Sequence, residues 1–125
     1  MKIIVAVVFI LHGLVHGILA MVPSPGANEP VFATFFSSSW LGLSDSAGKP
    51  LAFILATLAT VGFVAAGLGL LDFLVPFDWW RTLAAVSAVI SLLLLVIFWH
   101  PYVIVGVVID VVILVVVLFT DWTPE

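Results

Sequence analysis

The chain has 125 residues, of which 65% are hydrophobic and 8% are charged. Soluble globular proteins contain about 45–50% apolar residues, so this composition indicates a single integral membrane domain over residues 1–125. Three Lys and Arg residues and a net charge of −4 exclude a basic surface for nucleic acid, and the absence of cysteine excludes disulfides, thiolate metal sites and iron–sulfur clusters.

Four apolar runs meet the length of about 20 residues that a helix needs to cross a bilayer. They occupy approximately residues 3–22, 51–75, 80–98 and 102–119. Proline and polar residues separate them: Pro23 and Pro25 after the first, Pro50 before the second, Pro76 and Asp78 before the third, and His100 and Pro101 before the fourth. The sequence therefore predicts an all-α fold, a four-transmembrane-helix bundle with antiparallel neighbours.

The first run resembles a signal peptide only in part. Two histidines interrupt it and no small-residue cleavage site stands near Ala20, so we expect it to be retained as a span. Lys2 and Arg81 then lie on one side of the membrane and Lys49 on the other, which predicts cytoplasmic termini. Asp72 and Arg81 flank the turn between the second and third runs, where we expect an interfacial ion pair.

The long connection between the first two runs, residues 23–49, carries aromatic and apolar residues at helical spacing: Phe32, Phe35, Phe36, Trp40 and Leu43. This pattern predicts a short interfacial helix in the outer loop, with its aromatic face in the acyl boundary. A lid over a substrate site would have a similar pattern and is the alternative.

Small residues form stripes along all four runs. Because lipid provides no hydrophobic drive for helices to associate, small residues mark the faces where membrane helices approach closely. The predicted packing positions are Gly13, Gly17, Gly62, Ala66, Ala84, Ala88 and Gly106.

Three ionisable residues stand inside the apolar runs. His12 and His16 are one turn apart and share a face of the first helix, and Asp110 lies near the middle of the last. A charged group at the centre of a membrane helix costs about 2.5–3.5 kcal/mol, so Asp110 requires a partner. If the first and last helices are neighbours, His12 is that partner in a buried polar cluster of His12, His16 and Asp110. Hydroxyl groups of Thr57, Thr60, Ser87 and Ser91 could join the same layer.

Three interpretations of this cluster remain open. The favoured one is an interhelical polar clamp that fixes helix register, which requires no cofactor. The second is a proton or cation path, since ionisable side chains inside membranes often form relays. The third is a metal or haem site, because two histidines at i and i+4 with a carboxylate suit a transition metal and one histidine can ligate haem. His100 is interpreted as an interfacial turn residue, and no Ser–His–Asp spacing indicates catalysis.

The motifs FILHGLVHGILAM, WW and FWHPYVIVGVVIDVVIL resemble those of small bacterial four-helix membrane proteins grouped as DoxX-like. The resemblance implies a bundle with a histidine-bearing first helix and a polar residue midway along the fourth, in the inner membrane of a bacterial cell. The function we expect is that of a structural or interaction component of a membrane assembly. Its partners would be the lipid bilayer and either another membrane protein or further copies of the chain.

Overall fold

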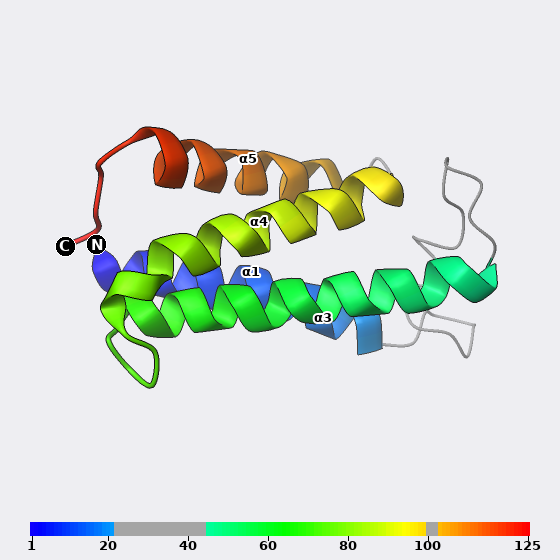
Figure 1. Cartoon of the computed structure of the whole chain (residues 1–125), viewed down its shortest axis with the longest axis horizontal. Coiled ribbons are helices and arrows are strands. Elements are labelled where there is room, and N and C mark those ends of the chain that lie inside the picture. Colours follow the sequence, from blue (N-terminus) through cyan, green and yellow to red (C-terminus); the bar gives the residue numbers. More distant parts are fainter. Residues whose placement is uncertain (22–44, 100–102) are drawn as a thin grey trace.

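A computed structural model describes residues 1–21, 45–99 and 103–125, and the described residues form helices without strands (Figure 1). The helices are α1 (Lys2–Met21), α3 (Asp45–Leu70), the short 3-10 helix η1 (Phe77–Trp79), α4 (Trp80–Ile97) and α5 (Ile104–Phe119). The all-α class is therefore confirmed. The predicted interfacial helix around Phe32 to Leu43 and the predicted turn residue His100 lie outside the described residues.

Two stretches, Pro50–Leu70 and Phe77–Ile97, are long and apolar enough to cross a membrane. The apolar stretches of α1, Lys2–Ile18, and of α5 are shorter. At a rise of about 1.5 Å per residue, the 16 residues of α5 extend over about 24 Å, against a hydrocarbon core of about 30 Å.

The apolar stretch of the second run begins at Pro50, one residue before the predicted start, but its predicted end at residue 75 is wrong, because α3 ends at Leu70. Helix α3 begins at Asp45, so Pro50 lies inside the helix instead of opening it. Its missing N–H removes only the bond that would reach the carbonyl of residue 46, at a helix end where few such bonds exist. Apolar composition continues to Val75, and hydropathy could not locate the end of the helix.

A Schellman turn ends α3 at Leu70. The N–H of Phe73 donates to the carbonyl of Leu68 over 3.0 Å, and the N–H of Asp72 donates to that of Gly69 over 3.0 Å. Asp72 takes the left-handed conformation that this motif requires, with φ of 53°. Glycine usually occupies this position, and without glycine the motif is hard to recognise in the sequence.

The closest backbone approaches join α1 to α3, α3 to α4 and α4 to α5. Glycines allow them. A Cβ at Gly13 would lie 2.9 Å from the Cβ of Phe63 on α3, and one at Gly67 would lie 2.8 Å from the carbonyl oxygen of Ala6 on α1. A Cβ at Gly62 would overlap Ser87 on α4, and one at Gly106 would lie 3.0 Å from Leu95.

Alanines and aromatic rings fill the space between these helices. Ala66, Ala84 and Ala88 are fully buried, and the rings of Phe9 and Phe63 lie 6.2 Å apart, centroid to centroid. The predicted packing positions on all four helices therefore lie at contacts within this one chain.

The two termini meet at one end of the bundle (Figure 1). The N–H of Lys2 donates to the carbonyl of Glu125 over 3.0 Å. The predicted Asp72–Arg81 ion pair is wrong, because Arg81 instead donates to the carbonyls of Val117, Thr120 and Trp122 at 2.5–2.9 Å. The carbonyls at the end of α5 lack partners in their own helix and carry the negative end of its dipole, so they compete for the guanidinium.

Candidate functional site

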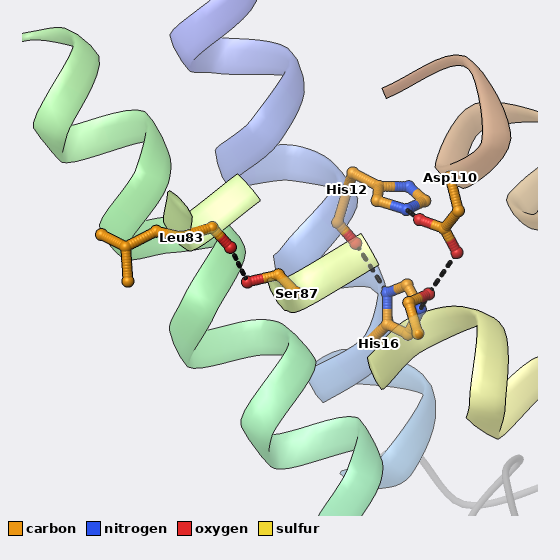
Figure 2. A network of polar contacts seen from close by, with 6 residues as sticks. His12, His16, Leu83, Ser87 and Asp110 are labelled. Carbon is orange, nitrogen blue, oxygen red and sulfur yellow. Dashed lines mark hydrogen bonds and ion pairs between the residues drawn. The ribbon is translucent and has the colours of Figure 1, made fainter. Parts of the chain in front are cut away.

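The structure brings His12, His16 and Asp110 together in the middle of the bundle (Figure 2). Ser91 of α4 is a fourth member. Asp110 and Ser91 are fully buried, and His12 and His16 are 9% and 5% exposed. The two histidines come from adjacent turns of α1 and point away from its exposed apolar side chains. The 3.6-residue repeat of the helix places both on one face.

Four hydrogen bonds connect these side chains. Nε2 of His12 lies 2.9 Å from Oδ1 of Asp110, and Oδ2 of Asp110 lies 2.5 Å from Oγ of Ser91. The same Oγ lies 2.8 Å from Nε2 of His16, whose Nδ1–H donates to the carbonyl oxygen of His12 over 2.9 Å. The bonds form a closed ring that begins and ends at His12.

This ring connects α1 to α4 and α5, two helices whose backbones are not its close neighbours. Helix α1 packs closely on α3, whereas its polar contacts reach Ser91 on α4 and Asp110 on α5. We expected the bond between His12 and Asp110 if the first and last helices are neighbours. The bond forms although their backbones are not close, because a histidine side chain is long enough to bridge a wider separation. The polar residues thus join α1 to the α4–α5 pair, beside apolar contacts such as that between the rings of Phe9 and Trp80.

Only one of the four candidate hydroxyls belongs to the ring. Ser87 lies one turn before Ser91 on the same buried face, but its hydroxyl donates to the carbonyl of Leu83 over 2.6 Å and points away from the ring (Figure 2). Thr57 and Thr60 likewise donate to carbonyls of their own helix, those of Phe53 and Ala56. Which serine meets Asp110 depends on the relative depth of α4 and α5, and helical periodicity does not specify that depth.

Aromatic contacts fix the orientation of the histidine rings. The ring of Phe63 lies 4.8 Å from that of His12 in an edge-on arrangement, and the two histidine rings are 5.0 Å apart, also edge-on. Phe63 is fully buried in α3. Sequence reasoning did not single out Phe63, although it is the one large side chain in a segment of small residues, GFVAAG.

Ser91, His16 and Asp110 do not have the arrangement of a hydrolytic triad. In a triad the carboxylate receives the Nδ1–H of the histidine, and the serine hydroxyl is free to attack substrate. Here a main-chain carbonyl receives that N–H, and the carboxyl group contacts the serine itself. Ser91 is also fully buried. The geometry therefore offers no exposed nucleophile.

Most of the atoms that could ligate a metal ion are already engaged in hydrogen bonds of the ring. The Nε2 atoms of both histidines and both oxygens of Asp110 take part in the four hydrogen bonds. Among the described residues, no three or more His, Cys, Asp or Glu side chains are grouped so that they could hold a metal ion. A metal bound to His12, His16 and Asp110 would require these bonds to break.

Comparison of the chain with protein-family models, with curated proteins and with solved structures found no match. The resemblance to DoxX-like proteins remains a prediction.

Proposed function

We propose that the chain is a four-span integral membrane protein that serves as a structural or interaction component of a membrane assembly. Its polar network acts as a clamp that fixes the register of the helices. The proposal rests on one observation: the bundle buries ionisable side chains and exposes apolar ones, the reverse of the arrangement in a water-soluble protein. The ionisable side chains in mid-helix turn inward, and the outer faces of α1 and α5 are apolar.

The outer faces of α1 and α5 illustrate this reversal. Their exposed side chains between residues 3 and 18 and between residues 104 and 119 are all Ile, Val, Leu or Phe. Water-soluble proteins rarely expose contiguous apolar surface of this extent, because it is costly to hydrate. Such a surface suits contact with lipid, which supports the proposal of four spans.

The interpretation as a clamp is supported by the hydrogen bonds of its side chains. In the described parts of the chain, no buried side-chain nitrogen or oxygen lacks a hydrogen-bond partner. The small-residue stripes are also used within the chain, so contact with a partner would run through the Leu, Ile, Val and Phe side chains of the perimeter. A path for inorganic cations is the weaker candidate, since both oxygens of the buried carboxyl group are already engaged.

We further propose that the membrane is the inner membrane of a bacterial cell and that both termini lie in the cytoplasm. The position of Lys2 and Arg81 at the end of the bundle where the termini meet supports this orientation under the positive-inside rule.

Photo-cross-linking in intact membranes, combined with the mass of the extracted complex, tests the proposed function. A cross-linking residue at outward-facing Val112, which is 55% exposed, should give adducts between copies or with a second membrane protein, and one at fully buried Ala84 should give none. A strictly monomeric protein without adducts at outward positions would contradict the proposal. A Soret band or stoichiometric metal in the purified protein would favour the cofactor interpretation instead.

A further inference from the structure

We propose that the ring of His12, His16, Ser91 and Asp110 is a proton-binding site that shares one proton between His16 and Asp110 through the hydroxyl of Ser91. The proposal goes beyond the role of a clamp and rests on a count of hydrogens. Each hydrogen bond needs one hydrogen on one of its two heavy atoms, and each residue type has a limited supply.

The count starts from the main-chain carbonyl of His12. A carbonyl oxygen only accepts, so Nδ1 of His16 must carry a hydrogen. The next two bonds, from Nε2 of His16 to Oγ of Ser91 and from Oγ to Oδ2 of Asp110, need two hydrogens. Ser91 supplies one of them. The other must come from His16 or from Asp110, and the ring is complete only when this additional proton is present.

Two arrangements satisfy every bond without leaving a net charge on the ring. In the first, His16 is an imidazolium that donates to Ser91, and Ser91 donates to an ionised Asp110. In the second, Asp110 is protonated and donates to Ser91, and Ser91 donates to a neutral His16. In both, a neutral His12 donates from Nε2 to Oδ1 of Asp110, and the ring has no net charge. Neutrality is what an apolar interior favours, since an isolated buried charge is costly.

A double proton shift converts one arrangement into the other. The N–H bond of His16 breaks as an O–H bond forms on Ser91, while the former O–H bond of Ser91 breaks and one forms on Asp110. The heavy atoms already lie at 2.8 and 2.5 Å and need not move. One unit of positive charge thereby passes from α1 to α5.

No other titratable side chain among those described joins the ring. Its ionisable members are His12 and His16 from α1 and Asp110 from α5. Residues 50–70 of α3 contain no Asp, Glu, Lys, Arg or His, and the only charged residue of α4, Arg81, donates to carbonyls at the end of α5. Loss of the shared proton therefore leaves one negative charge and one hydrogen bond too few, which weakens the hold of α1 on α4.

Infrared and nitrogen NMR spectra of the full chain in lipid nanodiscs, recorded over a pH series with labelled Asp and His, test the proposal. In the parent, the signals of Asp110 and His16 should change at one common midpoint, because a coupled pair loses its proton in a step that belongs to both groups. In Ser91→Ala, the common midpoint should be lost and the two signals should change separately. Ser87→Ala removes a buried hydroxyl one turn away and should behave like the parent.

Separate midpoints in the parent, or the same spectra for Ser91→Ala and Ser87→Ala, would overturn the proposal. If Ser91→Ala does not fold, Ser91→Thr restores the hydroxyl and should keep the common midpoint.

Asp110→Asn gives an independent measurement. Its amide can donate to Ser91 and accept from His12, which reproduces the second arrangement permanently, so His16 should be neutral at neutral pH. An imidazolium there would contradict the count. None of these readouts depends on whether the protein assembles with a partner.

Discussion

At the scale of single residues, one buried carboxyl group determines the chemistry of the interior. Asp110 has both oxygens within hydrogen-bond distance of partners from two other helices, His12 and Ser91. An unsatisfied buried polar group costs about 1–3 kcal/mol, whereas replacing a group by an isostere that keeps its bonds costs little. The shape and bonding capacity of this side chain therefore matter more for stability than its charge.

Substitution of Asp110 distinguishes these contributions. Asp110→Asn should keep the stability of the parent, because the amide can satisfy the same partners. Asp110→Leu should lower the free energy of unfolding by about 1–3 kcal/mol, because His12 and Ser91 lose their partner. Unfolding by sodium dodecyl sulfate, followed by circular dichroism, provides the comparison. Equal stability of the Leu variant and the parent would show that the ring does not clamp the helices.

At the scale of the helices, the absence of a side chain determines how closely α1 approaches α3. A Cβ at Gly67 would lie 2.6 Å from Cγ1 of Ile10 and 2.8 Å from the main-chain oxygen of Ala6. The second contact involves backbone, which cannot rotate away. Any side chain at this position pushes α1 outward, and with it the two histidines.

Gly67→Ala should therefore destabilise the bundle by about 1–3 kcal/mol, the usual cost of overpacking. Gly69→Ala is the matched control, because a Cβ at Gly69 meets its nearest atoms at an ordinary 3.4 Å. This control should match the parent or gain up to about 1 kcal/mol from the better helix propensity of alanine. The same unfolding assay applies, and equal loss in both variants would contradict the close approach at Gly67.

Arg81 determines how α5 ends. Its guanidinium donates to Val117, Thr120 and Trp122, and its charge lies at the negative end of the helix dipole. Arg81→Gln should release this end, at a cost of about 1.5–3 kcal/mol for hydrogen bonds to a charged group. Hydrogen exchange of residues 117–122 should become faster. Arg81→Lys keeps the charge without the planar fork and should be intermediate. Unchanged exchange in the Gln variant would rule out this capping role.

At the scale of the whole molecule, the two ends of the chain lie close together. The main-chain bond between Lys2 and Glu125 places both termini at one end. The four spans that we propose place both termini in the same compartment.

Cysteine labelling tests this topology without background, because the chain has no cysteine of its own. Single cysteines introduced beside Lys2 and beside Glu125 should both resist a membrane-impermeant reagent in intact cells and both react after permeabilisation. Labelling at only one terminus in intact cells would mean an odd number of spans.

The helical class and the presence of buried polar groups were predictable from the sequence alone, because both depend on local properties. Apolar runs form helices where no water is available, because the N–H and C=O groups of the backbone must then hydrogen-bond to one another. The spacing of His12 and His16 places them on one face of any helix. Small residues likewise mark close approaches wherever they form a stripe.

Other features depended on the tertiary structure. The partner of Arg81 proved to be a set of carbonyls 36 to 41 residues away instead of nearby Asp72. The end of α3 came from a Schellman turn at Asp72, within a run that stays apolar for several more residues. The choice of Ser91 over Ser87 came from the relative depth of α4 and α5. The choices at Arg81 and at Ser91 are competitions between groups distant in sequence, and distance and direction in three dimensions decide which group prevails. The turn at Asp72 is local, but it lacks the glycine that usually marks it in a sequence.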